Sequence, residues 1–240
     1  MSTGTHEKNR GSAPQKGGGS GKNRSLRIAA LAIVVVGIAV LALGAIFFLG
    51  NRDEAARGEP VGDPSGGGQA GKYPIQVGEP GPGEEAPPIE LSSTEGGAFE
   101  LASARDETVL LYFHEGLMCQ PCWDQLKDME TQSGKFEALG IDRTVGITTD
   151  PLNGLEQKVE DEGISTPQLS DPDLAVSETY DTNSYGMMGD SRNGHTFIVV
   201  GPDGKIQWRV DYGGAPDYTM YVPVPDLLAD MREGLEEGSS

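Results

Sequence analysis

Strand-like and helix-like patterns alternate along the second half of this 240-residue chain, and this alternation restricts the fold more than any other feature. The continuous apolar run 109–113 has the length of a strand that is covered on both faces. Helical spacing begins at Cys119, a second strand is expected at 144–149, and a second helix is expected from Leu152 to a stop at Gly163.

The last part of the chain continues the pattern. Segments 196–200 and 206–210 flank the turn Gly201-Pro202-Asp203-Gly204 and predict a hairpin, and the apolar positions of 224–235 predict an amphipathic helix. The predicted order is therefore β-α-β-α-β-β-α. Alternation implies parallel strands with right-handed crossovers, to which the hairpin adds an antiparallel edge. We expect an α/β fold with a mixed central sheet flanked by helices.

The only two cysteines, Cys119 and Cys122, directly follow the first of these strands. Open α/β sheets place their sites at the carboxyl ends of strands. A helix N-terminus lowers the pKa of a thiol there, so Cys119 is the expected nucleophile, and Cys122 can resolve a mixed disulfide formed at Cys119. Pro121 supports a helix start. The pattern favours thiol–disulfide exchange over the two alternatives, half of a metal site and a purely structural disulfide.

A second feature lies nearer the N-terminus, where residues 28–50 form 23 consecutive uncharged, mostly apolar residues. About 20 such residues span a bilayer core, so a transmembrane helix is predicted. Six basic residues and one acidic residue precede it, which by the positive-inside rule places the N-terminus in the cytoplasm and the remainder outside. The alternative is a cleaved signal peptide, although the apolar stretch is longer than those usually are.

Composition divides the chain around this segment. We expect a disordered cytoplasmic tail at 1–27, a disordered Gly-, Pro- and acid-rich linker at 51–82, and one domain at 83–238. The protein would then be a single-pass protein of the cell membrane with an extracytoplasmic domain, where disulfides persist. The formal net charge of −19 argues against a nucleic-acid partner.

The domain resembles the thioredoxin-like superfamily, which has this element order and a Cys-x-x-Cys at the start of its first core helix. Within it, the chain is similar to the redoxin branch, the alkyl hydroperoxide reductase/thiol-specific antioxidant family of peroxiredoxin-like proteins and its membrane-tethered thiol-disulfide relatives. The supporting segments are Ala86–Leu91, Gly97–Leu101, Leu169–Asp171 with Tyr180, and Thr196–Val200 leading into Asp203-Gly204. The resemblance implies an oxidoreductase without a cofactor, whose substrates are protein thiols and disulfides; it leaves the oligomeric state open.

The peroxidase loop of that family is absent. Its P-x-x-x-T-x-x-C pattern would require a proline and a threonine where this chain has Tyr112 and Gly116, counted from Cys119. Arg192 is expected to be a solvated loop residue, with an approach to the dithiol as the alternative. Peroxiredoxin-like antioxidant activity is therefore the second alternative to disulfide exchange.

His195 occupies the position where the resemblance implies a cis-proline against the dithiol. A cis bond before a non-proline residue costs about 3–4 kcal/mol, so a trans bond and an imidazole that faces the sulfurs are expected. His195 could stabilise the Cys119 thiolate as a cation, act as a general base, bind metal, or pack without chemistry.

The metal option resembles the Sco-type copper chaperones, and it is the first alternative function: a copper(I) metallochaperone that uses Cys119, Cys122 and His195. Exposed or packed methionines could add thioether ligands; the candidates are Met118, Met187 and Met188.

The sequence also predicts the exposure or packing of four more side chains near the dithiol. His114 is expected to be a partly exposed residue at a strand end, with orientation of the loop as its alternative role. Glu115 is expected to be an exposed loop carboxylate, with proton acceptance from Cys122 as its alternative role. Trp123 is expected to pack the helix, and Tyr112 to fill the core.

Overall fold

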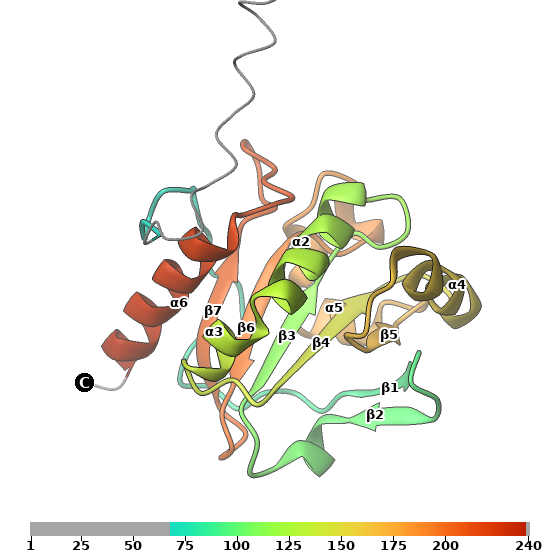
Figure 1. Ribbon diagram of the computed structural model, residues 1–240, viewed down its shortest axis with the longest axis horizontal. Helices are drawn as coiled ribbons and strands as arrows, with labels where there is room; N and C mark the ends of the chain where they lie inside the picture. Colours follow the sequence, from blue (N-terminus) through green and yellow to red (C-terminus); the bar gives the residue numbers. More distant parts are fainter. Residues whose placement is uncertain (1–67, 239–240) are drawn as a thin grey trace, which may run out of the picture. The chain divides into compact units, whose positions relative to one another are not determined.

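The computed structural model describes residues 68–238, which contain seven strands in one sheet (Figure 1). The strands are β1 (Glu90–Ser93), β2 (Ala98–Glu100), β3 (Val109–Phe113), β4 (Arg143–Thr148), β5 (Gln168–Ser170), β6 (Thr196–Val200) and β7 (Ile206–Asp211). The helices are α2 (Gln120–Thr131), α3 (Ser133–Glu137), α4 (Leu152–Glu162), α5 (Ala175–Thr179) and α6 (Val224–Gly238), with short 3₁₀ helices η1 (Leu101–Ala104), η2 (Thr182–Ser184) and η3 (Gly189–Ser191).

The sheet is mixed, as predicted, and its strand order is β2-β1-β5-β4-β3-β6-β7. The central strand β3 pairs in parallel with β4 and antiparallel with β6, and β4 pairs in parallel with β5. Both faces of β3 are covered, because all five of its residues are buried. This placement explains why its sequence is a continuous apolar run rather than an alternating one.

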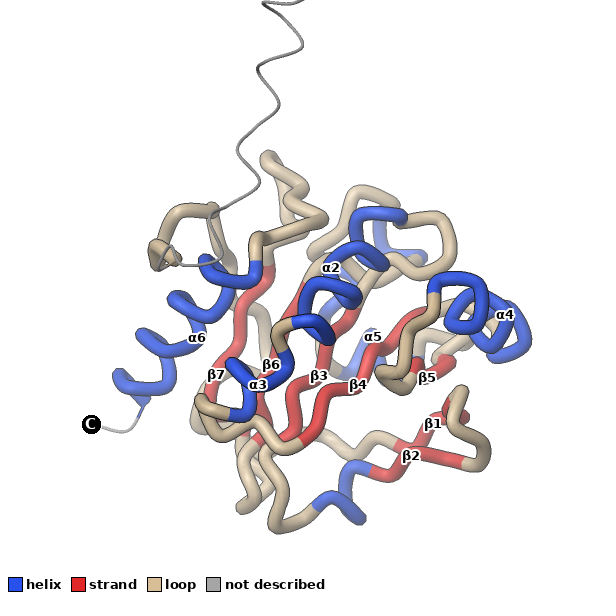
Figure 2. The backbone as a smooth tube through the Cα atoms, in the orientation of Figure 1, coloured by secondary structure: helices blue, strands red, loops and turns tan. Residues whose placement is uncertain are grey.

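Helices lie on both faces of the sheet (Figure 2), and one hydrophobic cluster fills each face. Leu110 and Tyr112 of β3 point to the face covered by α2 and α6, whereas Leu111 and Phe113 point to the face covered by α5. Successive strand residues point to opposite faces, so His114, which directly follows β3, falls on the same face as Tyr112. The α2 face is therefore the face that carries the dithiol.

Local sequence signals set several boundaries. Helix α2 has Cys119 as its N-cap and a proline in its first turn, and α4 ends at Gly163, whose φ of 68° favours glycine. The buried positions of α6 include Val224, Leu227 and Met231, which repeat with helical spacing. These predictions of helix starts and stops are confirmed.

Other elements were not predicted. The pair β1–β2 and the strand β5 extend the sheet at the edge opposite β7, and α5 covers its second face. β5 has only three residues, all buried, and so few positions show no periodicity that distinguishes a strand from a loop.

The domain also begins earlier than Gly83. Residue Gln76 pairs with Asp211 of β7 through backbone hydrogen bonds of 3.0 and 2.8 Å, and Lys72 forms an ion pair with Asp226 of α6. The expected linker therefore does not extend to residue 82: residues 68–82 lie against β7 and α6 because their backbone groups bond there.

No helix between residues 68 and 238 is both long enough and apolar enough to cross a bilayer. The predicted span 28–50 lies outside the described residues, together with the predicted tail 1–27 and residues 51–67 of the predicted linker.

A buried ion pair holds β7 to its surroundings. Arg209 donates to both carboxylate oxygens of Asp211 at 2.9 and 3.0 Å, and to the carbonyl oxygens of Pro80 and Tyr180. Asp211 also accepts hydrogen bonds from the Thr196 hydroxyl at 2.6 Å and from a backbone N–H at 2.8 Å. Both charged side chains are fully buried.

We predict that Arg209→Met lowers the free energy of unfolding by about 3–5 kcal/mol, because Asp211 would remain buried without its counter-charge. The matched control is Arg143→Met, which removes the exposed pair with Glu107 and should cost less than about 1 kcal/mol. Urea unfolding of both variants measures the difference, and equal losses would contradict the structural role assigned to Arg209.

Candidate functional site: the disulfide at the start of helix α2

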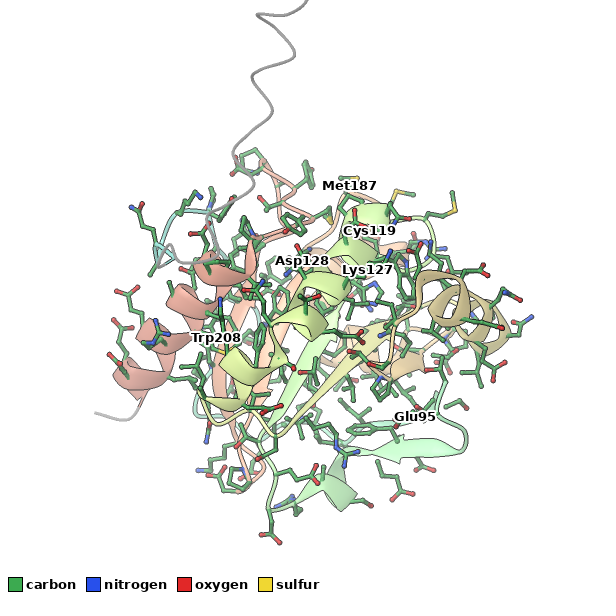
Figure 3. The ribbon with its side chains drawn as sticks, viewed as in Figure 1. Glu95, Cys119, Lys127, Asp128, Met187 and Trp208 are labelled. Carbon is green, nitrogen blue, oxygen red and sulfur yellow. A yellow bond between two sulfur atoms is a disulfide. The ribbon has the colours of Figure 1, made fainter. Side chains whose placement is uncertain are left out.

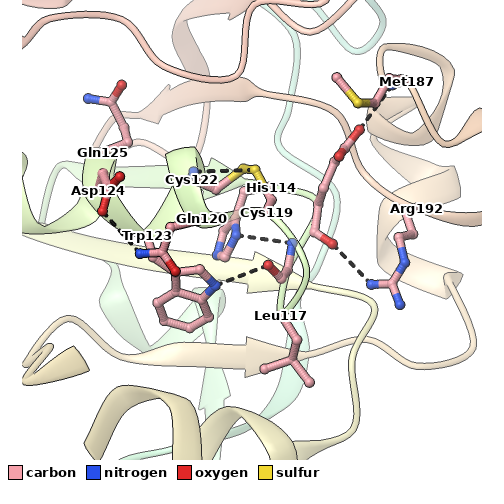
Figure 4. Close-up of a disulfide and its surroundings, with 12 residues drawn as sticks. His114, Leu117, Cys119, Gln120, Cys122, Trp123, Asp124, Gln125, Met187 and Arg192 are labelled. Carbon is pink, nitrogen blue, oxygen red and sulfur yellow. Dashed lines mark hydrogen bonds between the residues drawn. A yellow bond between two sulfur atoms is a disulfide. The ribbon is translucent and has the colours of Figure 1, made fainter. Parts of the chain in front are cut away.

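Cys119 and Cys122 form a disulfide at the N-terminus of α2, with their Cα atoms 5.3 Å apart (Figure 4). Sγ of Cys119 accepts a hydrogen bond of 3.2 Å from the backbone N–H of Cys122. Cys119 is 6% exposed, whereas Cys122 is completely buried. The helix terminus therefore directs a donor at the sulfur that is closer to solvent, and a donor there stabilises a thiolate.

The loop between β3 and α2 is held by a buried histidine. Nε2 of His114 lies 2.9 Å from Oε1 of Gln168, and Nδ1 of His114 accepts a hydrogen bond of 3.3 Å from the Gly116 N–H. This pattern assigns the proton to Nε2. His114 was expected to be partly exposed; it is fully buried, because Gln168 of β5 provides a partner inside the protein.

Gly116 and Trp123 fix the other side of this loop. Gly116 has a φ of 84°, and a Cβ there would lie 1.7 Å from a carboxylate oxygen of Asp150, so only glycine fits. The Trp123 indole N–H donates to the Gly116 carbonyl oxygen at 3.0 Å. Trp123 is buried as predicted, and it also holds the loop that precedes the disulfide.

Glu115 and Arg192 also differ from their expectations. Glu115 is buried, and its carboxylate accepts a hydrogen bond of 3.0 Å from the Met187 N–H. Burial raises the pKa of Glu115, and the backbone N–H groups of Met187 and Met188 oppose this shift. Arg192 is not merely solvated: it donates to the Glu115 carbonyl oxygen at 3.0 Å and to Asp150 at 2.9 Å.

Asp150 connects these contacts. It is buried, and its second carboxylate oxygen accepts a hydrogen bond of 2.8 Å from the Leu117 N–H. One carboxylate thus joins the loop before the disulfide to Arg192 and to the segment that carries Met187. No local sequence signal marked Asp150 or Gln168, because their partners lie far away in the sequence.

His195 lies on the α2 face of the sheet, beside the aromatic core under the disulfide. Its ring centroid is 5.2 Å from that of Tyr112 and 5.1 Å from that of Phe197. Because Phe113 pairs with Thr196, the next antiparallel pair in register is His114 with His195. Two histidines therefore meet at the end of the two central strands.

The peptide bond before His195 is trans, as expected, since the described residues have cis bonds only before Pro80 and Pro216. The imidazole is fully buried, and neither ring nitrogen makes a hydrogen bond of ordinary geometry, including to either sulfur. Burial, and then the neighbouring His114, lowers the pKa of His195 to about 3, while the Met220 backbone raises it slightly. His195 is therefore neutral at physiological pH in this oxidised form, in which there is no Cys119 thiolate for a cation to stabilise.

Two further polar atoms without partners lie on the same face. The Tyr112 hydroxyl and Nε2 of Gln125 are buried and unpaired, although Oε1 of Gln125 accepts a hydrogen bond of 2.7 Å from the Val222 N–H. Tyr112 fills the core as predicted and stacks on Phe197. No local sequence pattern predicts these unpaired polar atoms.

The side chains of residues 68–238 contain no group of three or more His, Cys, Asp or Glu that could hold a metal ion. In this oxidised form Cys119, Cys122 and His195 make no such group, and the copper alternative stays a prediction for the reduced pair. The two sulfurs are bonded to each other, and a disulfide supplies no thiolate ligand.

The AhpC/TSA family profile matches residues 82–209, more than half of the chain. A Mycobacterium tuberculosis protein named as a peroxiredoxin is 32% identical to this chain over 130 residues. The matched residues cover 52% of this chain and 81% of that protein. Among solved structures, the peroxidoxin BcpB of Mycobacterium tuberculosis superposes with a TM-score of 0.53 at 20% identity, covering 64% of this chain and 97% of that one. AhpC of Mycobacterium bovis gives a TM-score of 0.53 at 14% identity, covering 67% and 98%. These two structures show the thioredoxin-like fold.

We predict that the protein loses stability as the pH falls below about 6.5, because both buried histidines bind a proton only after unfolding. Burial is the main cause that lowers the pKa of His114 to about 4 and that of His195 to about 3. Above the pKa of the unfolded histidines neither state binds the proton, so the two residues lower no stability there. Below that pKa each histidine lowers the free energy of unfolding by up to about 1.4 kcal/mol per pH unit. Denaturant unfolding between about pH 7 and pH 5.5 measures the slope, and His195→Phe should reduce it. Equal slopes for the two proteins would show that His195 is not held neutral.

Proposed function

The chain belongs to the AhpC/TSA family, and on this premise we propose that it is a thiol–disulfide oxidoreductase that acts through Cys119 and Cys122. One observation carries the proposal: Cys119 is the N-cap of α2, and its sulfur accepts a hydrogen bond from the backbone N–H of Cys122. This contact stabilises a Cys119 thiolate in the reduced protein, and a thiolate is the reactive form.

The exchange has two steps. A substrate thiolate attacks Sγ of Cys119, the bond to Cys122 breaks, and Cys122 leaves as a thiolate that takes up a proton. A second substrate thiolate then attacks the mixed disulfide and releases Cys119 as a thiolate, so two electrons pass from the substrate to the protein. The reverse sequence reduces a substrate disulfide. This division of roles is supported by the exposed fractions, because Cys122 is completely buried whereas Cys119 keeps 6% exposure.

We propose that His195 accepts a proton during the exchange and does not contact the substrate. Its nitrogens are unpaired, and it shares the α2 face with Cys122, among aromatic residues of the same core cluster. A neutral imidazole can accept a proton when a negative thiolate forms nearby. No cofactor is needed for the exchange itself.

The location of the domain is also proposed. Anchoring through residues 28–50, with the N-terminus in the cytoplasm, would present the dithiol on the outer side of the cell membrane. The charge asymmetry of the sequence supports this orientation.

Peroxide reduction is the second candidate, and it is favoured by the names of two similar proteins, a peroxiredoxin and the peroxidoxin BcpB. The absence of a Pro and a Thr at positions 112 and 116 argues against it. Protein thiols and disulfides are therefore the substrates proposed first.

The proposed function predicts that Cys122→Ser traps a mixed disulfide at Cys119, because the resolving thiol is missing. Cys119→Ser is the matched control and should trap nothing, because the remaining thiol is buried. Non-reducing electrophoresis with a model dithiol protein measures the adduct. No adduct with the first variant would refute exchange at Cys119, whereas oxidation of the reduced wild type by hydrogen peroxide far faster than by glutathione disulfide would favour the second candidate.

The role of His195 predicts a change in the pH dependence of the reduction potential. If His195 gains a proton when the disulfide is reduced, His195→Phe should flatten the dependence by about 30 mV per pH unit over the range in which the imidazole titrates. Equilibrium with glutathione buffers at several pH values measures it. A variant with an unchanged slope would leave His195 only a packing role.

A further inference from the structure

Large apolar side chains are exposed mainly around the disulfide. Met118 is 85% exposed, Met187 is 52% exposed and Met188 is 54% exposed. Tyr218 is 40% exposed, and the other two exposed large apolar residues within 68–238 are Ile75 and Val77. Single exposed apolar residues are ordinary, but a group of exposed apolar residues near one reactive sulfur is typical of an interaction site.

The methionines belong to two segments near the disulfide. Met118 directly precedes Cys119, and the segment with Met187 and Met188 is held by the hydrogen bond of 3.0 Å from the Met187 N–H to Glu115. Figure 3 shows Met187 and Cys119 at the same end of the molecule. The hydrogen bond to Glu115 therefore fixes the backbone of the Met187 segment at the end of the molecule that carries Cys119.

The turn after β7 provides a third side. The Tyr212 N–H donates to the His195 carbonyl oxygen at 2.9 Å, and the Thr219 N–H donates back to the Tyr212 carbonyl oxygen at 3.2 Å. This turn, which carries Tyr218, therefore starts and ends beside His195. Figure 1 shows it at the same end of the sheet as the start of α2.

We call these three segments, 116–120, 186–191 and 214–218, the methionine rim. Their only charged residues are Asp190 and Asp217, and both are exposed. Two cations lie beside these segments, and both are paired: Arg192 with Asp150, and Lys158, which donates to the Gln120 side chain, with Glu162. The rim thus offers apolar contacts and negative charge, and no free positive charge, within a chain whose net charge is −19.

We propose that the methionine rim is a docking surface for an extended polypeptide substrate whose reactive cysteine is flanked by apolar and basic residues. This inference rests on the proposed exchange at Cys119 and names its class of substrate. Methionine side chains are flexible and polarisable, so they adapt to varied apolar side chains. The acidic residues attract basic flanks and repel acidic ones.

The test uses the full-length chain with Cys122→Ser and short peptides whose single cysteine carries a 2-thiopyridyl group. The Cys119 thiolate attacks the peptide sulfur, the peptide–Cys119 disulfide forms, and pyridine-2-thione leaves and is followed by absorbance. The peptides carry leucine and lysine, leucine and glutamate, or serine and asparagine beside the cysteine. Neutral 2,2′-dipyridyl disulfide reports the reactivity of Cys119 without docking.

We expect the leucine–lysine peptide to react at least about tenfold faster than the serine–asparagine peptide, and the leucine–glutamate peptide to lose part of that gain. Adding Met118→Ser, Met187→Ser and Met188→Ser should abolish the preference while the rate with dipyridyl disulfide stays unchanged. The matched control adds Ile75→Ser and Val77→Ser, which remove exposed apolar residues elsewhere and should preserve the preference.

Equal rates for all peptides, with normal reactivity toward dipyridyl disulfide, would overturn the docking surface and leave the exchange function intact. No reaction with dipyridyl disulfide would overturn the exchange function and the inference together. Concentration-dependent dimerisation that the three methionine substitutions abolish would show that a second copy of the chain covers the rim, which also contradicts the proposal.

Discussion

The contact between the first turn of α2 and the Cys119 sulfur is the interaction on which the rest of the site depends. The chain must leave β3, turn through Gly116 and begin a helix at Cys119, so that the Cys122 N–H points at the sulfur. A helix terminus lowers the pKa of a thiol only within its first turn. The chemistry therefore depends on a loop whose backbone position is fixed.

Buried polar groups provide that fixed position. Gln168 and His114 hold the start of the loop, Trp123 holds its middle, and Asp150 holds its end. Gln168 belongs to β5, Trp123 belongs to α2, and Asp150 follows the end of β4. The loop before Cys119 is therefore bound to three separate parts of the fold. Buried polar contacts of this kind are costly to leave unpaired, which favours one arrangement of the loop over others.

The predictable part of the structure follows from local signals. The apolar run of β3, the proline in α2 and the glycine that ends α4 each act on neighbouring residues, and the sequence alone predicts their elements. The same reasoning identified Cys119 and Cys122 as the centre of the site. The family resemblance predicted the thioredoxin-like fold. The trans bond before His195 was predicted from the cost of a cis bond before a residue other than proline.

The rest depends on contacts between distant residues. His114 and Gln168 are 54 positions apart, and Glu115 and Met187 are 72 positions apart, so no local pattern shows that either side chain is buried. His195 is neutral because the fold buries it, and no sequence pattern predicts that burial. The membrane segment at 28–50 remains a prediction, since it lies outside the described residues.

The reduction potential of the Cys119–Cys122 couple tests the central claim most directly. The reduced and oxidised forms of the full chain are brought to equilibrium with glutathione buffers of graded ratio, and the free thiols are counted after alkylation. An exchange-active dithiol predicts one reversible two-electron transition between about −270 and −120 mV, the range of known oxidoreductases. A disulfide that shows no reversible transition in these buffers would contradict the account and indicate a purely structural pair.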